Sequence, residues 1–364
     1  MQDYIDSIAR GETQIESQRS TQNCCEYVNN RGKTKHVFQL FCECNEVDES
    51  LEQIMTTGRI PNRTMCLRLE QDISDRIRFP WYGGALKLSI WFFLVPILFT
   101  LEYVIACLTL SPIIVSLLFN VWILWLSVRA MKTADSARSN MHVFYTGYAL
   151  FQVGLLYYQR FAGGVSNTIN YFVVLPLATT IVASYFCLRN VDPGTIVSMA
   201  PPEQNDKAAL AKYYVLHSAD RAKYCRIADV GVAHYDHFCI WVGRPIGRDN
   251  KRWFLLFCWS VFTGGVLFWW LTWWLTQQEQ HLASGERIYM LVVATRALLG
   301  CIATCLLLSR QCWLITIGLT TYENAHLYDL QQCGWVRTKT SFWENWRSLF
   351  VGTTHVNVTQ RRAL

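Results

Sequence analysis

Residues 253–276 read WFLLFCWSVFTGGVLFWWLTWWLT and contain no charged side chain. A helix that crosses the hydrocarbon core of a bilayer needs about 20 apolar residues, so this stretch predicts a transmembrane helix. The whole chain agrees, because its 364 residues are 52% apolar and only 16% charged, whereas a soluble domain carries about 25% charged residues. We therefore expect a membrane protein.

Five further apolar runs occur in the chain. They are residues 86–104, 105–128, 143–159, 169–188 and 288–308. The first two are nearly contiguous, and we place the break between them at Glu102-Tyr103, with a kink at Pro112. The prediction is an all-α polytopic membrane protein with six transmembrane helices, or five if the first two runs form one re-entrant unit.

The polar segments between these runs differ in their content of Lys and Arg. Residues 129–140, residues 189–252 and the C-terminal tail are rich in both, whereas residues 160–167 and 277–287 contain only Arg160 and Arg287. Cytosolic loops carry an excess of these two residues. We therefore predict that both termini and the two basic loops face the cytosol, as an even number of spans requires.

The charge and cysteine content disfavour several other classes. The formal net charge of +6 is small for this length and fits basic cytosolic faces better than nucleic-acid binding. Fourteen cysteines without a repeated CxxC pairing do not form a disulfide framework, which indicates reduced thiols. Few charges beyond Lys87 and Glu102 fall in the spans, which gives a channel or transporter little support. The polar N-terminus lacks the apolar core of a cleavable signal peptide.

The polar segment before residue 253 contains Asp236-His237-Phe238-Cys239. These side chains suit an activated cysteine, because His237 can take the thiol proton and Asp236 can fix the ring and stabilise the imidazolium. The thiolate is the reactive form of cysteine, and a neighbouring imidazolium favours it. On an ordinary loop such a tetrapeptide is usually structural. Its position between two spans puts Cys239 at the cytosolic membrane surface, where long acyl chains are found.

This segment resembles the cysteine-rich domain of the DHHC protein S-acyltransferases, also called palmitoyltransferases. The residues that carry the resemblance are Arg221, Cys225, Val232, Asp236-His237-Phe238-Cys239, Trp241-Val242, Gly247 and Asn250. Three motifs outside the domain also match, and they are Asp192-Pro193-Gly194 (the DPG motif), Thr320-Thr321-Tyr322-Glu323 (the TTxE motif) and Asn345-Trp346. Each also has a plain structural interpretation, since Asp-Pro-Gly makes a turn and Thr320 with Glu323 makes a helix capping box. The resemblance covers roughly residues 84–352.

The chain departs from the family at the zinc ligands. The family holds two zinc ions, and by spacing their ligand positions fall on Ala211, Tyr214, Tyr224 and Gly231 for one ion and on Cys225, Ala228, Phe238 and Pro245 for the other. Structural zinc needs about four nitrogen or sulfur ligands, and Cys225 alone qualifies here. His217 and His234 lie nearby but are too few to complete a site. We therefore expect no metal cofactor, with Tyr214, Tyr224 and Phe238 forming an apolar core instead; the opposing interpretation is a domain that no longer folds.

The resemblance implies a two-step acyl transfer. Cys239, with His237 and Asp236, would take a long-chain acyl group such as palmitoyl from acyl-CoA and pass it to a cysteine of a membrane-associated protein. Arg244, Arg248, Lys251 and Arg252 are candidates for binding the coenzyme A phosphates, although basic anchoring at the membrane explains them equally simply. In the family the TTxE segment, with Thr320, Thr321 and Glu323, contacts the catalytic loop, and the segment with Asn345 packs nearby.

A second function remains open from the sequence. A catalytically inactive membrane scaffold that binds partners would explain the missing zinc ligands, but it leaves the retained Asp236, His237 and Cys239 without a reason.

The sequence also predicts how the chain is divided. We expect a cytosolic N-terminal region (1–83), four transmembrane helices (84–190), a cytosolic catalytic domain (191–252), two more transmembrane helices (253–310) and a cytosolic tail (311–364). The family resemblance implies a Golgi or endoplasmic reticulum membrane.

Overall fold

The computed structural model describes residues 25–28, 34–36, 73–80, 85–109, 111–130, 140–196, 221–278, 284–332 and 341–351. The chain divides into two compact units, Met1–Leu98 and Phe99–Leu364. Each unit is described by itself below, and the candidate site lies wholly within the second.

The first unit contains two short antiparallel strand pairs. Strand β1 (Glu26–Val28) pairs with β2 (Thr34–His36), and β3 (Arg78–Phe79) pairs with β4 (Leu86–Lys87). The Asp75 carboxylate accepts hydrogen bonds from Arg78 at 2.5 Å and from Lys87 at 3.3 Å. Lys87 therefore belongs to a polar hairpin and not to a membrane span, which corrects its assignment from the sequence.

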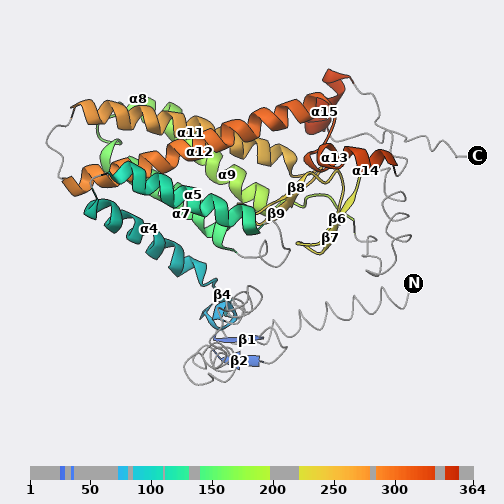
Figure 1. Ribbon diagram of the computed structural model, residues 1–364, viewed down its shortest axis with the longest axis horizontal. Helices are drawn as coiled ribbons and strands as arrows, with labels where there is room; N and C mark the ends of the chain where they lie inside the picture. Colours follow the sequence, from blue (N-terminus) through green and yellow to red (C-terminus); the bar gives the residue numbers. More distant parts are fainter. Residues whose placement is uncertain are drawn as a thin grey trace, which may run out of the picture. The chain divides into compact units, whose positions relative to one another are not determined.

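Long helices make up most of the described chain (Figure 1). They are α4 (Trp91–Leu108), α5 (Pro112–Ala130), α7 (Met141–Arg160), the continuous stretch of α8 (Asn167–Ile169), η2 (Asn170–Val174) and α9 (Leu175–Asn190), then α11 (Lys251–Gln278) and α12 (Ser284–Thr316). Within the described residues, five of these stretches are long and apolar enough to cross a membrane. The helix α7 has 20 residues but is not among the five. The all-α membrane class is confirmed.

The first two apolar runs separate later in the chain than we expected. The break falls at residues 109–111 instead of Glu102-Tyr103, so Glu102 is a fully helical residue of α4. Pro112 does not kink a helix, because it is the first residue of α5, where its missing N–H costs nothing. The charge of Glu102 is tolerated inside the helix because its carboxylate pairs with Arg296 of α12. Arg296 is an intramembrane charge that the sequence analysis missed.

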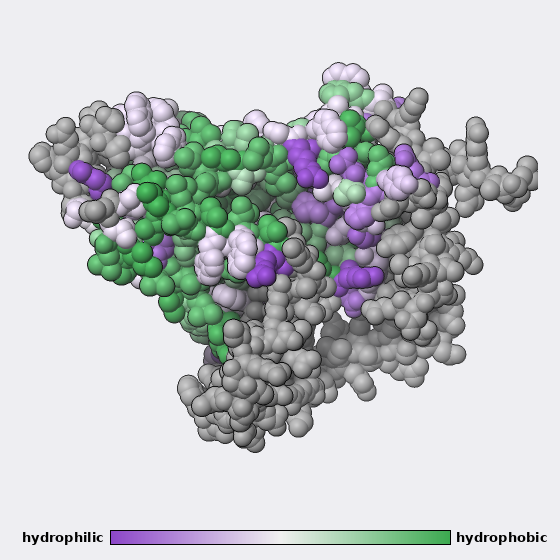
Figure 2. Space-filling model, viewed as in Figure 1, coloured by the Kyte–Doolittle hydropathy of each residue, from purple (hydrophilic) through white to green (hydrophobic). Residues whose placement is uncertain are grey.

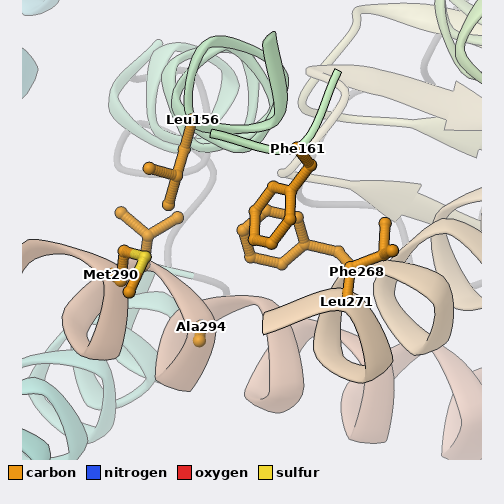
Figure 3. Packing of buried hydrophobic residues seen from close by; sticks show 7 residues of the cluster. Leu156, Phe161, Phe268, Leu271, Met290 and Ala294 are labelled. Atoms are coloured by element: carbon orange, nitrogen blue, oxygen red, sulfur yellow. The ribbon is translucent and has the colours of Figure 1, made fainter. Parts of the chain in front are cut away.

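Helices α7, α11 and α12 pack around a cluster of apolar side chains (Figure 3). The cluster comprises Leu156, Phe161, Phe268, Leu271, Met290, Val293 and Ala294. Gly265 lets α11 approach α12 closely, since a Cβ there would lie 3.2 Å from the Cβ of Cys301. Lipid chains are as apolar as these residues, so close packing stabilises the contact more than removal from water does.

Short strands and helices gather at one end of the bundle (Figure 1). Strands β5 (Thr195–Ile196), β7 (Val230–Val232) and β6 (Lys223–Cys225) form an antiparallel sheet in that order, and β8 (His237–Cys239) and β9 (Arg244–Ile246) form a hairpin. Helices α13 (Thr321–Ala325), α14 (Leu327–Gln332) and α15 (Phe342–Val351) follow α12. Figure 2 shows hydrophilic residues at this end and a hydrophobic surface over the helices.

Candidate active site

Strand β8 carries the Asp-His-x-Cys tetrapeptide. Successive side chains of a strand point to opposite faces, so His237 and Cys239 share one face and Phe238 lies on the other. The shared face meets the helical bundle, where the His237 ring packs edge-on against Phe254 of α11 at 5.2 Å and Cys239 belongs to a buried cluster with Phe254 and Leu188. The two-residue spacing of imidazole and thiol is thus a consequence of the strand.

The Asp236 carboxylate precedes this strand, is buried, and receives five hydrogen bonds. Its Oδ1 accepts from the Lys251 ammonium at 2.9 Å and from the Thr321 amide at 3.0 Å. Its Oδ2 accepts from the Thr321 hydroxyl at 2.7 Å and from the Gln311 amide group at 3.0 Å. The same oxygen lies 2.7 Å from Nδ1 of His237, which must carry a proton there because the carboxylate can only accept. Asp236 therefore fixes both the orientation and the tautomer of His237.

These contacts set the charges of the pair. Burial alone would raise the pKa of Asp236, but the Lys251 ammonium and the His237 imidazole outweigh it and hold this pKa well below its usual range. Burial alone would lower the pKa of His237, but the hydrogen bond to Asp236 and the contact with the Cys239 thiol raise it to about 9. At neutral pH the site therefore holds an ionised Asp236 and a positively charged His237.

The hairpin of β8 and β9 is held against the turn at Asp192-Pro193-Gly194. The Asp192 carboxylate accepts from the amides of Gly194 and Thr195, both at 2.6 Å, which shapes the turn. Gly247 follows β9, and a Cβ on it would lie only 2.3 Å from the Pro193 carbonyl oxygen. Glycine is therefore required at position 247 so that the hairpin can pack against this turn.

The TTxE motif contacts the residue that precedes β8, because Thr321 donates to Asp236. Thr320 caps α13: its hydroxyl accepts from the Glu323 amide at 3.2 Å, and the Glu323 carboxylate accepts from the Thr320 amide at 2.8 Å. This is the capping box that the sequence predicts. The carboxylate of Glu323 also pairs with Arg221, which donates in addition to the Gly318 carbonyl at 3.0 Å. One side chain of the motif thus shapes α13 while Thr321 holds Asp236.

The C-terminal motif contacts the end of α12. The Asn345 side chain donates to the Thr316 carbonyl at 3.1 Å, and the Trp346 indole donates to the Thr316 hydroxyl at 3.3 Å. Asn345 therefore ties α15 to α12 at Thr316, four residues before the TTxE segment begins.

The four basic candidates for phosphate binding lie in different environments. Arg244 stands directly opposite Cys239 in the hairpin, whereas Arg248 is exposed and pairs with Asp249. Arg252 is exposed beside the Trp253 ring at 5.6 Å. Lys251, however, is buried with its ammonium on Asp236, so the structure places it in the carboxylate network and not on a surface open to phosphate.

Of the described positions that correspond to zinc ligands in the family that the sequence resembles, Cys225 alone has a thiol or imidazole side chain. No group of three or more His, Cys, Asp or Glu side chains comes together within the described part of the chain. Cys225 instead lies in an apolar cluster with Val232 and Tyr235, against which Phe238 packs from β8. Tyr224 is half-buried and donates to Asp229, and Tyr214 lies outside the described residues.

Lys223 lies against two aromatic side chains of this apolar cluster, Tyr235 and Tyr322. The Lys223 ammonium lies 3.6 Å from the Tyr322 ring centre and 5.0 Å from that of Tyr235. Burial lowers the pKa of Lys223 to about 8, so the ammonium is still the main form at neutral pH. An ammonium over two aromatic faces is attracted to both. It joins β6 to the TTxE helix.

Sequence reasoning missed Gln311 and the role of Lys251. Gln311 is buried in α12 and donates to Asp236 and, at 2.9 Å, to the Thr321 hydroxyl. A glutamine near the end of an apolar run is a weak signal, because its partner is 75 residues away in sequence. Lys251 looked like one of several basic loop residues, and only the packing of α11 against β8 distinguishes it.

Comparison with known proteins gives consistent matches. Residues 204–327 match the family model described as DHHC palmitoyltransferase. The palmitoyltransferase ZDHHC23 of Mus musculus is 25% identical over 287 residues, covering 64% of this chain and 65% of the relative. The ZDHHC23 protein of Homo sapiens is 24% identical over 291 residues, which cover 64% of this chain and 69% of the relative. The palmitoyltransferase ZDHHC17 of Mus musculus is 27% identical over 126 residues, which cover 28% of this chain and 20% of the relative. The chain spans just under two thirds of the length of the mouse ZDHHC23 protein.

Proposed function

We propose that this chain, whose residues 204–327 match the DHHC palmitoyltransferase family model, is a protein S-acyltransferase in which Cys239 carries the acyl group. The donor would be a long-chain acyl-CoA, and the acceptor a cysteine of a membrane-associated protein. The observation that supports this most is the placement of His237 between the Asp236 carboxylate and the Cys239 thiol at the end of a helical membrane bundle. In this proposal Cys239 faces the cytosolic surface of a Golgi or endoplasmic reticulum membrane, and both termini are cytosolic.

The charge of His237 suggests how the proton moves. In the reacting form a Cys239 thiolate lies beside protonated His237, and the thiolate attacks the thioester carbonyl carbon of acyl-CoA. The bond between that carbon and the coenzyme A sulfur breaks, and His237 gives its proton to the departing thiolate. Neutral His237 then accepts a proton from the substrate cysteine, whose thiolate takes the acyl group and releases Cys239 as thiolate. Each cycle thus returns the site to its starting charges.

The surrounding groups position this pair. Asp236 stays ionised throughout, because Lys251 compensates its charge and Thr321 and Gln311 complete its hydrogen bonds. It therefore stabilises the imidazolium in both steps without exchanging a proton. Arg244, Arg248 and Arg252 are the remaining candidates for the phosphates of coenzyme A, with Arg244 nearest the nucleophile in the hairpin register.

We also propose that the catalytic domain folds and acts without zinc. The Lys223 contact with Tyr235 and Tyr322, and the Arg221–Glu323 ion pair, join β6 and the residues before it to the TTxE helix and support this proposal. A metal analysis of the purified protein should find well under one zinc per chain, and a strong chelator should leave acylation unchanged. About two zinc ions per chain would contradict this proposal while leaving acyl transfer possible.

The experiment that tests the activity is labelling in cells with a clickable palmitate analogue. Wild type should form a label that hydroxylamine releases, and Cys239→Ser should lose it because serine cannot form the thioester. The matched control is Cys312→Ser, which removes an exposed thiol of α12 and should keep the label. Equal labelling of wild type and Cys239→Ser, or no label on either, would reject Cys239 as the acyl carrier.

The absence of the family's zinc ligands favours one alternative, a membrane scaffold that binds partners without catalysis. It predicts that Cys239→Ser leaves every acylation level in the cell unchanged while the protein still binds its partners. Retained palmitoylation of a substrate only in cells that carry the wild-type cysteine would reject this alternative.

A further inference from the structure

A cavity of about 340 Å³ opens between α4, α7 and α12. Its lining residues come from the last helical turns of α7, the first turns of α12 and the second half of α4. Figure 1 places these segments at the end of the bundle opposite the strands that carry Cys239. The volume falls within the range of about 300–1,000 Å³ that is typical of small-molecule sites. Neither the catalytic residues nor the family motifs contribute to it.

Four aromatic rings, which we call the aromatic box, line this cavity. They are Phe99, Tyr103, Tyr148 and Tyr289. The rings form two edge-to-face pairs, each with one ring from α4. Phe99 pairs with Tyr148 of α7 at a centroid distance of 5.0 Å, and Tyr103 pairs with Tyr289 of α12 at 5.7 Å. The faces of such rings attract cations, and clusters of them recognise quaternary ammonium groups. The Arg296 guanidinium already lies 3.7 Å from the centre of the Phe99 ring, so a ligand cation would rely on Tyr103, Tyr148 and Tyr289.

The cavity also carries one acid and one base. Arg160 at the end of α7 and Glu286 in the first turn of α12 form an ion pair, with side chains 32% and 44% exposed. A partly exposed ion pair of this kind is weak, so each partner can turn to a ligand at little cost. The cavity thus offers a carboxylate near aromatic faces and a guanidinium at the same opening, and its charge balances to zero. A zwitterion with separated positive and negative groups matches this arrangement better than an ion of either sign.

The deeper wall of the cavity is also polar but neutral. Gln152 lines it and accepts a hydrogen bond from Arg296, whose other end pairs with Glu102. This buried pair fixes Gln152 and adds no net charge. The helix ends around the cavity are where membrane-crossing segments emerge from the bilayer, at the level where tyrosines and lipid headgroups meet.

We propose that this cavity binds the phosphocholine headgroup of a membrane phospholipid. The trimethylammonium group would lie in the aromatic box beside Glu286, and the phosphate would pair with Arg160. The acyl chains would remain in the bilayer against the apolar surface of the helices. The site does not depend on the acyl transfer proposed above, and it would be occupied equally in an inactive protein.

The test uses the full-length protein purified in a detergent free of phospholipid. Thermal unfolding is followed by tryptophan fluorescence while dioleoyl phosphatidylcholine, phosphatidylethanolamine or phosphatidylglycerol is added. Phosphatidylcholine should stabilise the protein with an apparent affinity at least about tenfold above that of the other two lipids, a factor that one lost ring or charge contact can supply. Glycerophosphocholine, which has the headgroup without acyl chains, forms a fourth arm.

Variants locate the effect in the cavity. Tyr289→Leu and Glu286→Gln should each weaken phosphatidylcholine binding about tenfold, whereas Tyr289→Phe keeps the ring and should keep the affinity. The matched control is Tyr158→Leu, which changes a 77% exposed tyrosine of α7 outside the cavity and should have no effect.

Three results would overturn the proposal: equal stabilisation by all three lipids, equal loss in Tyr158→Leu and Tyr289→Leu, or unchanged affinity in Tyr289→Leu. Saturation by glycerophosphocholine at the same concentration as the lipid would support the phosphocholine site but assign it a soluble ligand.

Discussion

Asp236 and Glu102 are both buried carboxylates paired with a basic side chain, yet their surroundings differ. Asp236 receives five hydrogen bonds from β8, α11, α12 and the TTxE segment, so both of its oxygens are fully used. Glu102 pairs with Arg296 through one oxygen, while its Oε1 and the Arg296 Nε have no partner within hydrogen-bond geometry. Asp236 is therefore held in one orientation, as the proposed chemistry requires, whereas Glu102 keeps one oxygen without a partner and Arg296 divides its contacts between Glu102, Gln152 and Phe99.

The largest expected effect is the loss of the Asp236 charge. Asp236→Asn should lower the rate of Cys239 acylation by about 10³- to 10⁴-fold, as when the carboxylate of a catalytic triad is neutralised. The amide cannot stabilise the imidazolium, and it presents a donor where His237 also donates. Single-turnover labelling with acyl-CoA measures the rate, and binding of a non-hydrolysable acyl-CoA analogue serves as the control. A loss of less than about tenfold would show that His237 is oriented by other contacts.

Breaking the Glu102–Arg296 pair should affect stability and leave the chemistry intact. Glu102→Gln leaves Arg296 buried and uncompensated, which should cost about 3–5 kcal/mol. The double variant Glu102→Gln/Arg296→Met removes both charges and should recover most of that loss. Thermal unfolding measures the loss and recovery of stability, and acylation per folded molecule measures whether the chemistry is intact. If the double variant were as unstable as the single one, the pair would have a role beyond mutual compensation.

The pH dependence of stability tests the charge of His237. Its folded pKa of about 9 lies above the ordinary value of 6.5, so protonated His237 stabilises the fold below pH 6.5. This contribution is lost as the pH rises through 9, and the shift corresponds to roughly 3 kcal/mol. Unfolding of wild type and His237→Gln should be compared from pH 6 to pH 10, because the difference isolates this group from Lys223 and other residues. A difference that does not change with pH would contradict a raised pKa.

The smallest expected effect comes from Gln311. Gln311→Leu removes one of the five donors to Asp236 while keeping the side-chain volume similar, and should lower the acylation rate about tenfold, or about 1.4 kcal/mol. Gln311→Glu provides the contrast, because a second carboxylate beside Asp236 should raise the pKa of one of them and shift the pH profile. Identical pH profiles for the two variants would show that Gln311 only fills space.

Much of this molecule could be predicted locally. Apolar runs predict helices because every residue of a span must satisfy its own backbone and meet lipid, so the signal lies within about 20 consecutive residues. The tetrapeptide Asp236–Cys239 is equally local, since strand alternation alone puts His237 and Cys239 on one face. The capping box of Thr320 and Glu323 also depends on residues three apart.

The errors have a common cause. Glu102 looked like a break between helices, because the sequence does not show that Arg296, 194 residues away, supplies its partner. Lys251 looked like a surface base for the same reason, since its partner Asp236 is brought to it by the packing of α11 on the hairpin.

The sequence by itself determined the membrane class and most helical segments, and it singled out Asp236, His237 and Cys239 as candidates, because each of these depends on neighbours along the chain. Only the tertiary structure decided which buried charges compensate one another. It assigned Lys251, Gln311 and Thr321 to Asp236, paired Arg296 with Glu102, and placed Lys223 between two tyrosines near the positions of the family's zinc ligands. The physical reason is that a buried charge requires a partner in space, and a folded chain can bring that partner from any distance in sequence.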